Sequence, residues 1–303
     1  EIDIVGRVYE HFMSQTEMGE FYTPKTIVDL LVELLRPETH VYDPTCGTGG
    51  LLLQIRPNVR RNLFLIGQEA NPEAWRPAHM NMLMNGAEFN LGNYPADTLH
   101  DDVWEGHKFD CIMANPPYNV KDWGAEALRN DPRFEYGIPP NSNANFAWIQ
   151  HIAHHLDEGG RAGIVMANST LSGSVGNEGN IRLGLLKADL VEAIISLPDK
   201  LFYNTGIPVC IWVLTRAKPR HRRGQVLMID AKDMGAIISR TQRTLSADEI
   251  NRIASVYHAW RGEGYADDSG FCRSVGLDDI KKYDGVLTPG RYIGVKDEQG
   301  EVG

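Results

Sequence analysis

A glycine-rich turn and an acidic residue stand where two neighbouring strands are expected to end. The turn runs from Asp43 to Gly50 (DPTCGTGG), and Glu69 closes the next apolar run. Glycines let the backbone approach a ligand, loop amides can donate to its polar groups, and a carboxylate can accept from ribose hydroxyls. Because the dinucleotide GxGxxG and the phosphate-loop GxxxxGK[ST] patterns are absent, we expect a nucleoside cofactor without a pyrophosphate. A tight turn beside a surface acid is the structural alternative.

The tetrapeptide Asn115, Pro116, Pro117 and Tyr118 follows a third apolar run. Two prolines cannot continue a sheet ladder, so the turn should present its side chains at the rim of the same crevice. The Asn115 amide oxygen and the Pro116 carbonyl can accept from one amino group, and Tyr118 offers a face for stacking. The motif is therefore typical of a site for a planar amine, although a bare strand-terminating turn would look similar.

The elements around these motifs alternate between apolar runs and helical patterns. Thr23 is expected to cap a helix that has Pro24 in its first position. We expect strands at 40–43, 63–68, 109–114, 163–167, 191–197, 209–215 and 226–230. Further helices are expected at 51–55, 73–84, 144–156 and from Ser246 to Trp260. This alternation predicts an α/β fold with a mostly parallel sheet, helices on both faces, and an antiparallel hairpin formed by the strands at 191–197 and 209–215.

Composition narrows the functional class. The chain has 303 residues, 42% of them hydrophobic, and a net charge of −10, which argues against strong non-specific DNA binding on its own. Yet no acidic residue lies between Asp199 and Asp230, and this basic stretch contains Lys200, Arg216, Lys218, Arg220, Arg222 and Arg223. That stretch is either a solvated loop or a phosphate-contacting surface. The four cysteines are widely separated and no apolar run could span a bilayer, so we expect a cytoplasmic protein with no membrane partner.

Taken together, these motifs resemble the S-adenosylmethionine-dependent DNA adenine-N6 methyltransferases, specifically the modification subunits of type I restriction-modification systems. The resemblance extends from Gly19 to Ile229, and the early Phe-Tyr-Thr-Pro element corresponds to the gamma-class motif order. It implies a Rossmann-like methyltransferase fold, S-adenosylmethionine as cofactor, and double-stranded DNA as substrate. It also implies a specificity subunit and a restriction subunit as partners.

The resemblance further implies roles for individual residues. The catalytic turn would be Asn115, Pro116, Pro117 and Tyr118. The cofactor would be held by Phe21, Tyr22, Thr23, Pro24, Asp43, Thr45, Gly47, Gly49, Glu69 and Asp97. Family members usually carry glycine where Ala96 stands, one residue before Asp97. The implied organisation is a helical remnant at 1–18, a catalytic domain at 19–245, and a C-terminal helix and tail at 246–303 as a candidate partner contact.

Two rival functions stay open at this point. Methyltransferases that act on protein glutamine also present an NPPY turn, and the chain could be a non-catalytic cofactor-binding subunit of a defence complex. His151, His154 and His155 share one helix at ligand-like spacing, but no acidic or cysteine residue stands beside them in the sequence. We therefore expect partly buried surface histidines and no metal site. Phe146 could form the far wall of a stacking pocket, but is expected to be a core aromatic.

Overall fold

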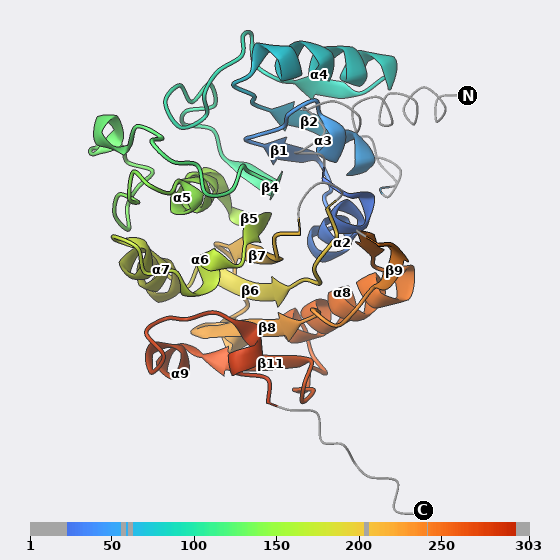
Figure 1. Ribbon diagram of the computed structural model, residues 1–303, viewed down its shortest axis with the longest axis vertical. Helices are drawn as coiled ribbons and strands as arrows, with labels where there is room; N and C mark the ends of the chain where they lie inside the picture. The colour runs from blue at the N-terminus through green and yellow to red at the C-terminus, as the bar shows by residue number, and fades with distance from the viewer. Residues whose placement is uncertain (1–22, 56–58, 60–62, 203–205, 241, 295–303) are drawn as a thin grey trace, which may run out of the picture.

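A large mixed sheet forms the centre of the protein. The computed structural model describes residues 23–294 except 56–58, 60–62, 203–205 and 241. The nine strands of the sheet lie side by side in the order β11-β8-β6-β7-β5-β4-β1-β2-β3 (Figure 1). Their bounds are β1 His40–Asp43, β2 Phe64–Gly67, β3 Glu88–Asn90, β4 Phe109–Ala114, β5 Leu156–Ala167, β6 Val191–Ser196, β7 Val209–Thr215, β8 Gln225–Asp230 and β11 Cys272–Gly276. Strands β7 and β11 run antiparallel to their neighbours, and the other pairings are parallel.

Helices cover both faces of this sheet and lie on opposite sides of it in Figure 1. One face carries α2 Lys25–Leu35, α3 Gly50–Ile55, α4 Pro72–Met84 and α8 Ala247–Arg261. The other carries α5 Asn145–His155, α6 Ser169–Ser172, α7 Glu178–Lys187 and α9 Leu277–Lys281. Short 3-10 turns occur at η3 Ala125–Leu128, η4 Arg220–Arg222 and η5 Pro289–Arg291. No helix among the described residues is both long and apolar enough to cross a bilayer.

Strand β7 shows why two helical layers are needed. All seven of its residues are buried. Ile211 and Val213 belong to the apolar cluster under α2 and α8, whereas Trp212 and Leu214 belong to the cluster under α5 and α7. Because successive side chains point to opposite faces of a sheet, an uninterrupted apolar strand requires cover on both. The expected α/β fold, including the β6–β7 antiparallel hairpin, is confirmed.

Several elements were not anticipated from the sequence. Strand β3, helix α7 and the separate two-stranded ribbon of β9 Ala236–Ser239 and β10 Gln242–Thr244 carry weak patterns. Strand β5 starts at Leu156, directly after α5. Strand β11 lies in the stretch expected to be a polar tail, yet it pairs with β8 and so extends the main sheet. Pairing partners supplied by the fold stabilise these segments more than their own composition does.

The two edges of the parallel strands have different roles. The carboxyl edge holds the segments that follow β1, β2, β4, β6 and β8. The amino edge holds the segment after β7, since β7 is antiparallel and Thr215 at its end pairs with Arg161 near the start of β5. Ligands of open α/β sheets bind beyond the carboxyl ends of the strands, so the carboxyl edge is where a site is expected.

Candidate active site

The glycine turn is built directly onto the end of β1. Asp43 is buried, and its Oδ1 accepts from the backbone N–H of Thr45 at 3.0 Å. The backbone N–H of Cys46 donates to the carbonyl of Gln68 at 2.9 Å, which ties the turn to the end of β2. The glycine turn and the end of β2 are therefore neighbours, as the sequence predicts.

Two glycines of this turn are required for different reasons. Gly47 and Gly49 have φ angles of +56° and +82°, in the left-handed region that favours glycine. A side chain on Gly49 would also lie 2.7 Å from Cε of Met82 in α4, whereas a side chain on Gly47 would enter open space. Gly49 thus permits close packing of α4, and Gly47 leaves the turn open on its outer side, where a ligand could approach.

Glu69 joins the second strand to the glycine turn. Its carboxylate accepts from the backbone N–H of Gly47 at 3.0 Å and from that of Asn71 at 2.7 Å. Each carboxylate oxygen therefore retains a lone pair for a further donor. This is the donor-accepting chemistry that a ribose diol needs, and it fits a nucleoside at this turn.

Asp97 lies on an exposed loop at the same edge. Its Oδ1 accepts from the backbone N–H of Leu99 at 3.0 Å, and its Oδ2 lies 3.1 Å from Nδ1 of His100. The loop is fixed to the glycine turn because the Thr98 hydroxyl donates to the carbonyl of Pro44 at 2.5 Å. The backbone N–H of Ala96 donates to the carbonyl of Glu69 at 2.9 Å. The structure thus brings Asp43, Glu69 and Asp97 to one connected surface.

Burial sets the electrostatics of this surface. It raises the pKa of Asp43 to about 7, and the nearby Glu69 carboxylate adds to the rise while the Thr45 N–H opposes it. Burial also raises the pKa of Glu69 above its usual range, against hydrogen bonds from Asn71 and Gly47. Two carboxyl groups with raised pKa values beside an open turn favour a ligand that brings hydrogen-bond donors or positive charge.

The NPPY turn follows β4, which pairs with β1. Asn115 donates from Nδ2 to the hydroxyl of Thr23 at 3.1 Å, and its Oδ1 accepts from the Tyr118 hydroxyl. Thr23 therefore does not cap α2, contrary to expectation: the helix begins at Lys25 with Pro24 in the cap position and no side-chain cap. The Thr23 hydroxyl instead links the segment before α2 to the NPPY turn.

The aromatic residues near this turn have distinct positions. Tyr118 is half-buried and packs against the core cluster below α2, and burial raises the pKa of its hydroxyl. Phe146 is fully buried in the opposite cluster, in edge-to-face contact with Trp212, so it is a core residue and not the wall of a pocket. Pro116 is buried and Pro117 half-buried. Phe21 and Tyr22 lie outside the described residues.

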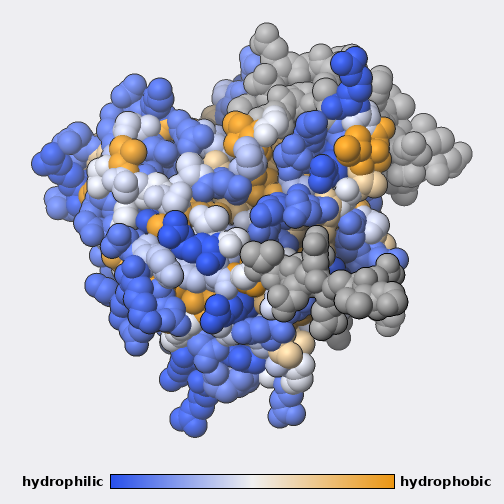
Figure 2. Space-filling view, turned by 60° about the horizontal axis from the view of Figure 1, so that its bottom comes forward, coloured by the Kyte–Doolittle hydropathy of each residue, from blue (hydrophilic) through white to orange (hydrophobic). Residues whose placement is uncertain are grey.

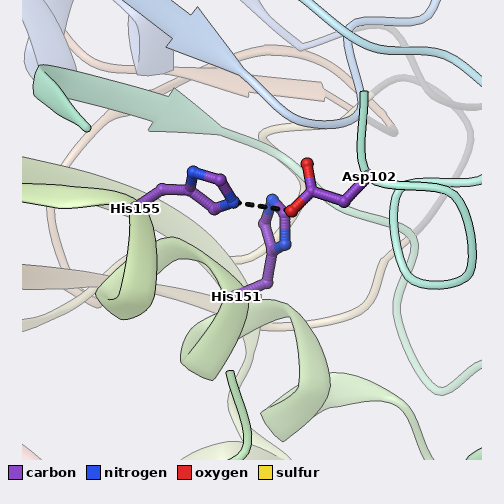
Figure 3. Close-up of side chains that lie close together, drawn as sticks. All are labelled: Asp102, His151 and His155. Atoms are coloured by element: carbon purple, nitrogen blue, oxygen red, sulfur yellow. Dashed lines mark hydrogen bonds and ion pairs between the residues drawn. The ribbon is translucent and has the colours of Figure 1, made fainter. Parts of the chain in front are cut away.

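The histidine prediction needs correction. His151 and His155 are fully buried, not partly exposed, and an acidic partner does stand beside them: Asp102, from the loop after Asp97 (Figure 3). Its Oδ2 lies 2.8 Å from Nε2 of His155, the contact drawn as a dashed line in Figure 3. Sequence spacing could not show this, because Asp102 is on a different segment, 53 positions from His155.

Arg133 determines the character of this trio and was missed by the sequence reasoning. Its guanidinium donates to Nδ1 of His151 at 3.1 Å and lies 3.7 Å from Oδ2 of Asp102, so positive charge already occupies the centre. It also donates to the carbonyls of Thr98 and Leu99 at 2.8 and 2.5 Å. Burial lowers the pKa of His151, which keeps that ring neutral. The cluster therefore fixes the Asp97 loop and does not suit a metal ion.

Lys200 of the basic stretch follows β6 on the carboxyl edge, but the cations from Arg216 to Arg223 follow β7 and lie on the amino edge, away from the glycine and NPPY turns. Lys218 is buried and donates to Asp189 and to the carbonyl of Val191. The Arg222 guanidinium lies over the rings of Trp260 and Tyr265, each at 5.2 Å. These contacts stabilise the fold and favour the structural interpretation of the stretch. The four cysteines are buried and unpaired, as befits small core residues.

Comparison with known proteins first defines a class. The fold, with the glycine turn, Glu69 and the NPPY turn at the carboxyl ends of β1, β2 and β4, is that of the S-adenosylmethionine-dependent methyltransferases. Among solved structures, a type I restriction-modification methyltransferase subunit from Streptococcus thermophilus superposes with a TM-score of 0.85 at 30% identity, over 96% of this chain and 64% of that one. The EcoKI M protein superposes with a TM-score of 0.66 at 22% identity, which bears on the fold alone.

The family follows from the sequence matches. The N-6 DNA Methylase family model matches residues 1–301, and the chain belongs to that family. The HindI methylase subunit of Haemophilus influenzae is 44% identical over 98% of this chain and 70% of its own length. The MjaIX methylase subunit of Methanocaldococcus jannaschii is 38% identical over 98% of this chain but only 56% of its own length. The resemblance to type I modification subunits is thereby confirmed, and these matches support it over the protein-glutamine alternative.

Proposed function

We propose that this chain transfers the methyl group of S-adenosylmethionine to the N6 amine of an adenine flipped out of double-stranded DNA. The observation that carries the proposal is the hydrogen bond from Asn115 to Thr23. It places the segment implied to contact the cofactor directly against the turn implied to hold the base. Donor and acceptor sites must adjoin for an in-line transfer, and positioning of this kind supplies much of the rate enhancement of an enzyme.

The residues at the carboxyl edge fit the cofactor. Glu69 would accept from its ribose hydroxyls, and Asp97 from its adenine amine. Thr45, Gly47 and Gly49 shape the turn against which the cofactor would lie, and the buried Asp43 carboxyl holds that turn by accepting from the Thr45 N–H. Thr23, Pro24, Phe21 and Tyr22 would complete the site from the segment before α2. When bound, S-adenosylmethionine supplies a methyl group already activated on a positively charged sulfur.

The NPPY turn would act on the target amine. The lone pair of the adenine amine is delocalised into the purine ring, so the amine is a weak nucleophile. Asn115 Oδ1 and the Pro116 carbonyl would accept hydrogen bonds from the two N–H groups of the amine and so stabilise the positive charge that develops on its nitrogen. Asn115 Oδ1 already accepts a hydrogen bond from the Tyr118 hydroxyl. To bind the base, this amide oxygen must either use its second lone pair or exchange the tyrosine hydroxyl for the amine. The ring of Tyr118 would stack on the flipped base and offset part of the cost of flipping.

Partners are proposed by analogy with the relatives, which are named as subunits of type I restriction enzymes. The chain would act beside a specificity subunit that selects the DNA sequence, and a restriction subunit would join the assembly. The net charge of −10 supports this division of labour, because an acidic chain needs help to hold a polyanion.

The test is a transfer assay with radiolabelled S-adenosylmethionine. The chain, with its specificity subunit, is incubated with genomic DNA from an adenine-methylation-deficient host, and separately with total protein. We expect label in DNA as N6-methyladenine, and a loss of label when Asn115 is replaced by alanine. Label in protein, or DNA methylation that survives Asn115→Ala, would contradict the proposal.

A further inference from the structure

The β9–β10 ribbon is an exposed apolar feature on a largely polar surface, and helix α4 carries a second one with Met80, Leu83 and Met84. Figure 2 shows a mostly hydrophilic face with hydrophobic residues in small, separate patches. All four residues of β9 are exposed, and Ile237 and Ile238 have 66% and 56% of their surface in solvent. Because neighbouring residues of a strand point to opposite faces, each face of the ribbon carries one isoleucine. Neither face of this two-stranded sheet is buried in the core.

The ribbon is anchored beside the candidate active site. The backbone N–H of Arg243, in β10, donates to the carbonyl of Lys200 at 2.8 Å, in the loop that follows β6 on the carboxyl edge. Just after β10, the backbone N–H of Leu245 donates to the Thr26 hydroxyl at 3.1 Å. Thr26 lies three residues from Thr23, which holds Asn115. The ribbon therefore rises from the same edge as the NPPY turn.

Charge indicates which partner fits the ribbon. The stretch from Met234 to Thr244 contains Arg240 and Arg243 and no acidic residue, in a chain whose net charge is −10. Arg240 is exposed next to the ribbon's turn, whereas Arg243 donates to the carbonyl of Met234 and lies 3.6 Å from the carboxylate of Asp199. Among the described residues, Arg240 therefore carries the free positive charge of the ribbon. A two-stranded β-ribbon fits the major groove of B-DNA, and apolar side chains there contact base edges such as the thymine methyl. A locally basic, apolar ribbon matches that partner.

We propose that the β9–β10 ribbon contacts double-stranded DNA next to the target adenine, with the isoleucine of its DNA-facing side, Ile237 or Ile238, against base edges and Arg240 on a backbone phosphate. The ribbon would hold the duplex that flanks the flipped base at the height of the NPPY turn. This inference rests on the proposed function, because it assigns the flanking duplex of the same substrate.

The apolar contact is tested with the double variant Ile237→Thr/Ile238→Thr, which keeps β-branched side chains in the strand. The matched control is Met80→Gln/Leu83→Gln on α4, where the side chains are similarly exposed at 59% and 66% but lie beside β3 at the far end of the sheet. The chain with its specificity subunit is titrated with fluorescent fragments of unmethylated genomic DNA. We expect at least fivefold weaker DNA binding and a raised KM for DNA in the ribbon variant, with unchanged S-adenosylmethionine affinity, and no change in the control.

The phosphate contact is tested with Arg240→Gln against Arg223→Gln on the amino edge. Loss of one phosphate contact should reduce the slope of log K against log salt by about 0.9 for Arg240→Gln only. Unchanged DNA affinity in the isoleucine variant would overturn the inference, as would loss of subunit assembly without loss of intrinsic DNA affinity, which would make the ribbon a protein interface. If the wild-type complex methylates no DNA at all, the proposed function fails instead, and the two outcomes are distinguishable.

Discussion

The two edges of the sheet both carry charged side chains, but these have different neighbours. On the amino edge, the fold itself holds two of the cations: Lys218 donates to Asp189 and two carbonyls, and Arg222 lies over two aromatic rings. Arg220 and Arg223 are exposed there. On the carboxyl edge, burial raises the pKa of both Asp43 and Glu69, and the Glu69 carboxylate adds to the rise at Asp43. Charged groups that are paired within the fold stabilise the structure, whereas carboxyl groups whose pKa is raised by burial are suited to binding a ligand.

The largest effect expected from this contrast is on catalysis. Asn115→Ala should lower the methylation rate by about 100- to 1000-fold, since it removes an acceptor aimed at developing charge. Cofactor affinity should change little, because Asn115 acts on the amine. Single-turnover methyl transfer measures the rate, and calorimetry with S-adenosylmethionine measures the affinity. A variant that transfers methyl groups at the wild-type rate would show that the turn is only structural.

The amino edge should respond in stability instead. Lys218→Met should lower the free energy of unfolding by about 3 kcal/mol, because it leaves the carbonyls of Val191 and Gln225 without this donor and Asp189 with only the Gly224 N–H among the described residues. Denaturant unfolding measures this loss. Below the melting transition, the DNA affinity and its salt dependence should match the wild type. Weaker DNA binding at unchanged stability would place the basic stretch at the nucleic acid and break the comparison.

A binding effect on the carboxyl edge comes next in size. Glu69→Ala should weaken S-adenosylmethionine by roughly 1.5–3 kcal/mol, since it removes a charged acceptor and leaves the Gly47 N–H without its partner. Glu73→Ala, an exposed acid in the first turn of α4, is the matched control and should bind normally. Calorimetry that finds equal affinity in Glu69→Ala and the control would remove Glu69 from the cofactor site.

The raised pKa of Asp43 makes a prediction about pH. The folded chain holds this proton up to about pH 7, whereas the unfolded chain releases it near pH 4, so the group's contribution to stability falls as the pH rises between these values. Relative to the wild type, Asp43→Asn should therefore gain about 2 kcal/mol of stability between pH 5 and pH 8. Denaturant unfolding of both proteins at each pH measures the difference. A constant difference between the two free energies of unfolding across this pH range would mean that folding does not raise the pKa of Asp43.

The last prediction is that removing exposed cations from the amino edge has no effect on DNA binding. Arg220→Gln/Arg223→Gln removes two cations from the amino edge, near η4, and should leave both DNA affinity and its salt slope unchanged. Anisotropy titrations over a range of salt concentrations measure both quantities. A shallower salt slope in this double variant would move the DNA path to the amino edge and would count against the β9–β10 ribbon as well.

Local patterns were sufficient for most of the fold. Strand β7 is an almost unbroken apolar run, and α2 directly follows a proline and has a strongly apolar face, so both were predictable. Strand β3 and the ribbon strand β10 have three residues each and little hydrophobic pattern. Strand β11 mixes exposed and buried residues and is stabilised by pairing with β8. Whether such a segment forms a strand depends on pairing with strands far away in the chain, and the local sequence pattern does not show those partners.

The sequence by itself determined the turn chemistry: glycines at positions 47 and 49, a carboxylate at the end of β2, and an amide followed by two prolines after β4. These features are local, because they depend on backbone conformation and on where a strand ends. Only the tertiary structure decided that Thr23 bonds Asn115 across 92 positions, that Arg133 fixes the Asp97 loop among buried histidines, and that most of the basic stretch faces away from the site. The direction of β7 sets the last of these, and strand direction depends on pairing in three dimensions.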